Sequence, residues 1–311
     1  MKKLLITFVA VLALAGCKKT GPGALVDPAL STLVPADTTL LVGIRVEDLM
    51  KTPIYQKYLA NRPIGPVDDF TRQTGLDVRK DLWEVLFISN GKENVVLGRG
   101  KFSNEAEPRL DRPGAKRSNY RGFTMVGDDK TSVLLMGPTL AGVGDTAGLK
   151  RIIDTRDQTN GPPAILVERM KDIPHEAGIW SVFTGAPIAL PANPTANMGN
   201  IIKVLDSLES GSLYLDLRSG ISGKITGITP ADKNGKELYD TLRGVLGIIR
   251  MMGAKDDASL QRLLDGLRIT QDGRTVNLYI EEREDAVNML FDFITRTFSG
   301  RTPPAVPAPK R

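Results

Sequence analysis

The sequence predicts an α+β fold with mostly antiparallel sheets, helices packed on one face, and two similar halves. Three observations lead to this prediction. Strand patterns come in pairs around tight-turn residues, and amphipathic helical patterns lie between the pairs. The composition, 41% hydrophobic and 25% charged over 311 residues, is that of an ordinary globular protein. At about 150 residues a domain, this length allows two domains.

The first half begins with an alternating strand over residues 40–46, in which Leu40, Val42 and Ile44 share one face. Two hairpins follow, one around Asn90-Gly91 and one around Gly127-Asp128, because such residues tolerate tight turns. The expected strands cover residues 83–89, 94–98, 122–126 and 131–136, and the expected helices cover 53–59, 67–74 and 146–154. Asp145 is the expected N-cap of the last of these helices.

The second half repeats this style. The expected helices cover residues 164–171, 198–208, 230–252 and 284–298, and the expected strands cover 179–183, 212–217, 221–229, 267–271 and 275–281. Thr229 is the expected N-cap of the longest helix, and Pro230 its first residue. Its apolar stripe runs from Leu238 to Met252 in steps of 4, 3, 4 and 3, which predicts a buried face. We expect close backbone packing to offset Gly244 and Gly247 within it.

The predicted division of the body is an N-terminal half over residues 29–160 and a C-terminal half over residues 161–299. The runs Leu82-Trp83-Glu84-Val85 and Ile179-Trp180-Ser181-Val182 share an apolar-Trp-x-Val start and contain both tryptophans. This match suggests an internal duplication, with unrelated halves as the alternative. Residues 300–311 are rich in proline and are predicted to be a disordered tail.

The first 16 residues are typical of a bacterial export signal. Lys2 and Lys3 precede an apolar run that is too short to span a membrane. The tetrad Leu14-Ala15-Gly16-Cys17 resembles the lipobox of bacterial lipoproteins at every position. That resemblance implies recognition of Leu14, Ala15 and Gly16 by the signal peptidase. It also implies cleavage before Cys17, attachment of diacylglycerol to its thiol and acylation of its new amine with a chain such as palmitate.

An anchored protein of this kind faces the periplasm and is held close to the membrane by a short linker. Residues 17–28 are predicted to be a flexible tether that reaches about 15–20 Å. The second mature residue is Lys18 rather than Asp, and by the sorting rule of enteric lipoproteins this favours the outer membrane.

The mature chain also resembles a family of uncharacterised bacterial envelope proteins built from two α+β halves. The resemblance rests on Val34-Pro35-Ala36-Asp37, Asp48-Leu49, Thr52-Pro53 and Ile173-Pro174, together with Ile179-Trp180 and the helix that carries Arg243. No activity is known for that family, so the resemblance implies no catalytic residues.

One cysteine and one histidine exclude a disulfide framework and the usual zinc sites, so no metal or cofactor is expected. The net charge of +5 is too small for a dedicated nucleic-acid binder. His175 is interpreted as a loop residue, because no serine nucleophile motif accompanies it.

A basic cluster is the candidate contact with anionic lipid or another envelope component. Five cations fall within thirteen residues of a loop broken by Pro and Gly, with a solvated loop as the alternative. They are Arg109, Arg112, Lys116, Arg117 and Arg121.

The sequence therefore predicts a lipid-anchored envelope protein that binds, scaffolds or assists assembly and is not an enzyme. Two alternatives stay open. A periplasmic hydrolase would need a cleft with several carboxylates of raised pKa, and a lipid carrier would need a large closed apolar cavity.

Overall fold

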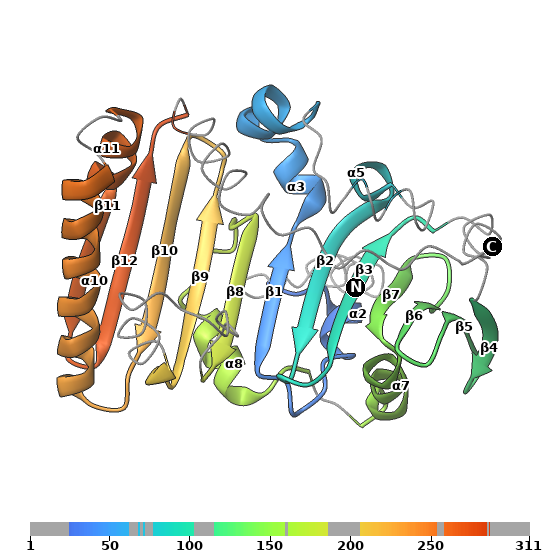
Figure 1. The fold of residues 1–311 in the computed structure, drawn as a ribbon. Helices are drawn as coiled ribbons and strands as arrows, with labels where there is room; N and C mark the ends of the chain where they lie inside the picture. The colour runs from blue at the N-terminus through green and yellow to red at the C-terminus, as the bar shows by residue number, and fades with distance from the viewer. Residues whose placement is uncertain are drawn as a thin grey trace, which may run out of the picture.

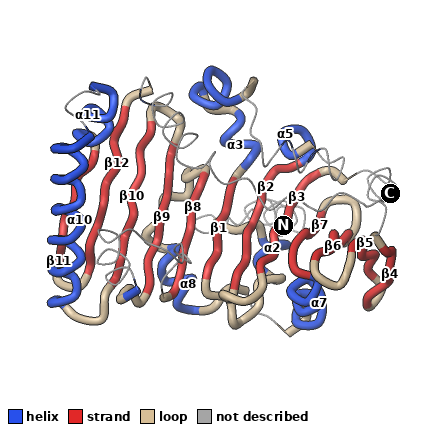
Figure 2. Tube along the Cα trace, viewed as in Figure 1, coloured by secondary structure: helices blue, strands red, loops and turns tan. Residues whose placement is uncertain are grey.

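The computed structural model describes residues 25–61, 68, 71, 77–102, 115–158, 161–185, 206–253, 258–284 and 286. They form an α+β fold around one antiparallel sheet of 12 strands, which runs across the whole molecule (Figures 1 and 2). The strand order is β11-β12-β10-β9-β8-β1-β2-β3-β7-β6-β5-β4.

The strands are β1 (Leu40–Ile44), β2 (Leu82–Ser89), β3 (Asn94–Gly100), β4 (Lys116–Tyr120), β5 (Phe123–Gly127), β6 (Thr131–Leu135), β7 (Leu140–Asp145), β8 (Ile179–Thr184), β9 (Ser210–Asp216), β10 (Ile221–Ile228), β11 (Leu267–Asp272) and β12 (Thr275–Glu282). The helices are α2 (Pro28–Ser31), α3 (Val46–Met50), the π-helix η1 (Tyr55–Leu59), α5 (Val78–Asp81), α7 (Thr146–Thr155), α8 (Ala164–Met170), α10 (Asp232–Gly253) and α11 (Ala258–Asp265).

The two predicted halves meet edge to edge within this single sheet. Strand β1 pairs with β8, with Leu41 opposite Val182 and Gly43 opposite Trp180. On both sides of this junction the third strand pairs with the last one, β3 with β7 and β10 with β12. The tryptophan match does not follow this repeat, because Trp83 lies in the second strand of its half and Trp180 in the first. A duplication therefore stays a prediction.

One face of the sheet carries the main core. Trp180 is fully buried there and lies over Gly43, where a β-carbon would come within 2.1 Å of the indole ring. Helices α2, α7 and α8 cover this face with buried leucines and isoleucines, among them Leu30, Leu149 and Leu166. We call this the α7 face.

Helix α10 lies on the opposite face, beside β11 and β12 (Figure 1). Leu238 packs there with Phe183, Leu208 and Val276, all on the side away from Trp180. The expectation that all helices pack on one face is therefore wrong. The α10 stripe is also buried only at its start, since Leu238 is 3% exposed and Ile249 is 38% exposed.

Three further expectations need correction. A β-carbon added at Gly244 or Gly247 would have no neighbour within 4 Å, so close packing does not offset these two glycines. The long helix begins at Asp232, two residues after Pro230. Asp145 is the N-cap residue of α7, as expected, but its side chain makes no capping hydrogen bond and instead accepts the backbone N–H of Asn94 at 2.7 Å.

The packed body begins earlier in the chain than predicted. Leu25 and Val26 are buried in the core of the α7 face, and Asp27 caps α2 by accepting the backbone N–H of Ala29. The predicted tether of residues 17–28 therefore overlaps the folded body by four residues. Residues 1–24, the tail over 300–311 and most of the helices expected over 67–74, 198–208 and 284–298 lie outside the described residues.

Candidate functional site

A polar cleft of about 430 Å³ lies where the two halves of the sheet meet. Three segments far apart in the sequence form its walls, and they adjoin the same end of the neighbouring strands β1, β8 and β9. Its lining residues are Arg45, Asp48, Lys51, Thr52, Pro53, His175, Glu176 and Arg218. We call it the junction cleft.

Arg45 holds two of these segments together. It follows the last residue of β1, and its backbone N–H donates to the carbonyl of Gly178 at 2.9 Å. Its guanidinium also donates to the carbonyl oxygen of His175. The loop that leads into β8 is thereby fixed against the end of β1. Because a guanidinium has five N–H donors, this contact leaves further donors on the same group.

Arg218 comes from the turn between β9 and β10. Asp216 holds its guanidinium with two oxygens, at 3.0 Å from Nε and 2.6 Å from Nη2. The side-chain hydrogen bond with Arg218 lowers the pKa of the Asp216 carboxyl. This pair fixes the direction of the guanidinium, although 56% of the Arg218 side chain is exposed.

The third wall is the segment from α3 to η1. Lys51 pairs with Glu47 at 2.8 Å and with Asp48 at 3.7 Å, and the hydrogen bond that it donates to Glu47 raises the pKa of Lys51. Thr52 is buried and accepts the backbone N–H of Tyr55 at 3.2 Å. The exposed charged side chains of Glu47, Asp48 and Lys51 therefore lie next to a turn whose Thr52 is buried.

The cleft mixes both signs of charge. Arg45, Lys51 and Arg218 face it with Asp48 and Glu176, and His175 is exposed at its rim. No group of three or more His, Cys, Asp or Glu in the described part of the chain could hold a metal ion. The arrangement suits recognition of a small charged molecule by hydrogen bonds and ion pairs.

Glu84, a described carboxylate whose pKa is raised, does not line the junction cleft. Burial raises its pKa, and it accepts the backbone N–H of Asp27 at 3.1 Å. Arg99 lies 3.4 Å from the Asp27 carboxylate and donates to the Thr139 hydroxyl at 2.6 Å. These residues fasten the start of the folded body to β2 and β3.

The predicted basic loop is in part regular structure. Lys116 and Arg117 belong to the edge strand β4, and Arg121 lies in its turn with a φ of 49°. Arg109 and Arg112 lie outside the described residues. By register, Arg117 opposes Val126 and so points away from the α7 face, whereas Lys116 shares that face with Met125.

Two more cations join this group, Lys150 on α7 and Arg156 directly after it, and they were not predicted from the sequence. Lys150 lies 5.4 Å from the ring centre of Tyr120, and Arg156 lies 4.7 Å from that of Phe123. Asp154 accepts from the Tyr120 hydroxyl at 2.9 Å and pairs with Arg121 at 2.8 Å. We call the group made by the exposed Lys116, Arg121 and Lys150 and the half-buried Arg156 the basic corner. Its only sequence signal was the charge of the polar side of α7.

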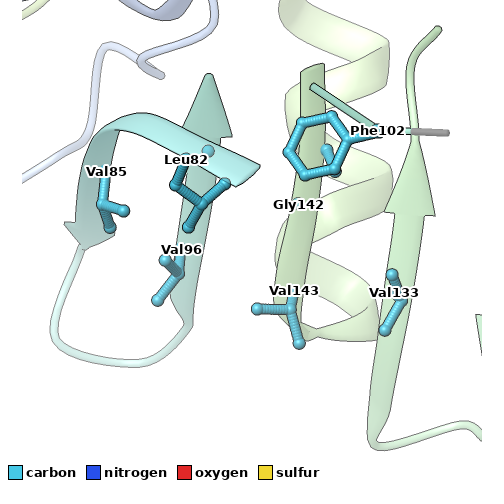
Figure 3. Close-up of a pocket in the computed structure, with 9 residues that line it drawn as sticks. Leu82, Val85, Val96, Phe102, Val133, Gly142 and Val143 are labelled. Atoms are coloured by element: carbon cyan, nitrogen blue, oxygen red, sulfur yellow. The ribbon is translucent and has the colours of Figure 1, made fainter. Parts of the chain in front are cut away.

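The face opposite α7 has a shallow apolar pocket of about 40 Å³. Leu82, Val96, Val133 and Val143 line it on neighbouring strands, and Phe102 lies beside them (Figure 3). A pocket of this volume holds a few water molecules at most, so it is too small for an acyl chain. Among the described helices, none is long and apolar enough to cross a membrane.

Comparison with known proteins finds similarity in fold alone. No protein-family model matches the sequence, and no curated protein matches it. The chain resembles the solved structure of TP0453 in crystal form III, with a TM-score of 0.53 and 12% identity over 86% of this chain and 98% of that one. Crystal form IV of TP0453 gives a TM-score of 0.49 at 14% identity, over 88% of this chain and 99% of that one.

Proposed function

We propose that this chain is a lipid-anchored envelope lipoprotein that binds or scaffolds other envelope components without catalysing a reaction. The observation that carries the proposal is the lipobox Leu14-Ala15-Gly16-Cys17, placed a few residues ahead of Leu25, which is buried in the folded body. Acylation at Cys17 would hold the body at a membrane surface, since two or more acyl chains anchor a protein stably. Lys18 favours the outer membrane, facing the periplasm.

The short linker after Cys17 limits the distance and the orientation of the folded body relative to the membrane. Seven residues, Lys18 to Ala24, separate Cys17 from Leu25 and span at most about 25 Å when extended. The chain enters the body among the core residues of the α7 face, and the basic corner lies over the same face. On an anionic membrane each nearby cation contributes about 1 kcal/mol, within a Debye length of about 8 Å. We propose that the acyl chains give affinity and the basic corner orients the body.

Fractionation of cells tests the anchor. The unchanged chain should be found with the membranes and should leave them only in detergent. Cys17→Ala should accumulate as an uncleaved, unacylated precursor. Cleavage and acylation of that variant would contradict the proposal.

Vesicle binding tests the orientation. We expect anionic vesicles to protect the α7 face of the unchanged chain from proteolysis. The triple variant Lys116→Gln, Lys150→Gln and Arg156→Gln should lose part of this protection, and added salt should have the same effect on the unchanged chain. The matched control removes three exposed cations of α10 on the other face, Lys233, Lys236 and Arg243. An equal effect of both triple variants would mean that net charge, not the basic corner, sets the orientation.

The two alternatives have less support. The raised pKa that a carboxylate hydrolase would need belongs to Glu84, outside the junction cleft. The apolar pocket beside Phe102 holds a water-sized volume of about 40 Å³, not a lipid. Neither observation favours a second function.

A further inference from the structure

We propose that the junction cleft binds a small zwitterion, the carboxylate and ammonium groups of an amino acid or of a short peptide. Nothing in this inference depends on the lipid anchor, so it stands or falls separately from the proposed function. The cleft of about 430 Å³ has room for an amino acid or a dipeptide.

The charges on the walls decide the class of ligand. Three cations, Arg45, Lys51 and Arg218, line the cleft together with two carboxylates, Asp48 and Glu176. A phosphate or a simple carboxylate would face the two acids, and a metal ion would face the three cations. A ligand with both charges can place its carboxylate beside the cations and its ammonium beside the carboxylates of the cleft. Because it avoids like-charge contacts, it should bind better than a ligand with one charge.

The cationic side is already oriented for a carboxylate. Asp216 holds the Arg218 guanidinium in place with contacts of 2.6 and 3.0 Å, and the His175 carbonyl holds that of Arg45. Fixed guanidinium groups lose less conformational entropy on binding, and their remaining donors can bind a carboxylate with two hydrogen bonds.

The acidic side has a carboxylate to spare. In the described part of the chain, Glu176 makes no hydrogen bond or ion pair, although its charge interacts with that of Arg218. Asp48, in contrast, shares Lys51 with Glu47. Glu176 is exposed on the loop that Arg45 fixes, next to His175. It can therefore receive a ligand ammonium without breaking a resident pair.

The experiment uses the full chain in mild detergent and follows the imidazole proton signals of His175, the only histidine in the sequence. Alanyl-alanine should shift these signals saturably. The N-acetylated dipeptide lacks the ammonium and the dipeptide amide lacks the carboxylate, so each should bind about tenfold more weakly. Free alanine and trialanine are titrated in the same way as two further ligands. Tighter binding of alanine would indicate an amino acid ligand, and tighter binding of trialanine a peptide end.

Two variants assign the charges. Arg218→Gln should weaken alanyl-alanine about tenfold. Glu176→Gln should leave the dipeptide no better than its N-acetylated form, and because Glu176 makes no hydrogen bond or ion pair with the described residues, this variant should fold normally. The matched control is Arg274→Gln, since Arg274 is 55% exposed and paired with Glu209 at 3.5 Å on the surface. Absence of any shift, equal binding of the acetylated form to the unchanged chain, or an equal loss in the control would overturn the proposal.

Discussion

The two ends of the sheet carry their helices on opposite faces, and between them α8 covers β8 and β9 on the α7 face. On the β1–β7 side, α2 and α7 cover the face of Trp180, whereas α10 covers the opposite face beside β11 and β12. Away from α10, those last strands present polar residues such as Lys224, Asn277 and Tyr279. Away from α7, β2, β3 and β7 still present Val85, Val96 and Val143, which are half-buried.

This difference shows when alternation in a sequence predicts which face is covered. In β10 and β12 the apolar face is the one under α10, so the pattern and the packing agree. In β2 and β3 both faces are apolar, so alternation has no contrast from which to choose. The expectation of helices on one face is wrong because β10 and β12 have their apolar face on the side opposite α7, where α10 covers it.

The largest expected effect is at the junction of the two sides. Trp180→Ala should destabilise the protein by about 3–5 kcal/mol, because the indole is fully buried over Gly43. Trp83 is the matched control, since it is 41% exposed, and Trp83→Ala should cost under about 1 kcal/mol. Urea unfolding measures both. Equal losses would mean that the junction is no more tightly packed than the rim of β2.

The second prediction concerns the gradient of burial along α10. Leu238→Ala should cost about 2–5 kcal/mol, because this side chain packs against Phe183 and Val276. Ile249→Ala should cost under about 0.5 kcal/mol, since it is 38% exposed. If the two variants lost the same stability in chemical unfolding, the end of α10 would be packed as well as its start.

A third prediction contrasts glycines on the two sides. Gly244→Ala and Gly247→Ala should each stabilise the protein by about 0.5–1 kcal/mol, because a β-carbon meets no neighbour there and alanine favours the helix. Gly142→Ala in β7 should destabilise it, since its β-carbon would lie 3.0 Å from both Leu149 and Leu97. Thermal melts of the three variants give the signs, and a loss at Gly244 would contradict the open space seen around it.

The smallest expected effect depends on pH. Burial raises the pKa of Glu84 in the folded protein, so the folded state holds its proton more tightly than the unfolded chain. That contribution to stability is present below the usual pKa of a glutamate and is lost as the pH rises through the raised value. Glu84→Gln should remove this part of the pH dependence in unfolding curves and keep the acceptor for the Asp27 N–H. An unchanged pH dependence would contradict the raised pKa.

Much of the strand order along the chain was predictable from local signals. The turns at Asn90-Gly91 and Gly127-Asp128 join paired strands as expected, and Gly91 has a positive φ. Strand β4, Lys-Arg-Ser-Asn-Tyr, was missed because an edge strand with exposed side chains has no apolar alternation. Helix α3 was missed because Val46 continues the alternation of β1.

The junction cleft was not predictable from the sequence. Arg45, His175 and Arg218 are far apart along the chain, and only the pairing of β1, β8 and β9 brings the three segments together. The same holds for Lys150 and Arg156, which reach the rings of Tyr120 and Phe123 because α7 packs over β7 and β6. Local patterns carry no information about such long-range neighbours.

Intact-mass spectrometry of the protein extracted from membranes tests whether Cys17 carries the lipid anchor. We predict a single N-terminus at Cys17, with a diacylglycerol on its thiol and an acyl chain on its amine. The chain from Lys18 onward should be unmodified. A free Cys17 thiol, or a mature N-terminus at any other residue, would mean that Cys17 is not the lipid anchor.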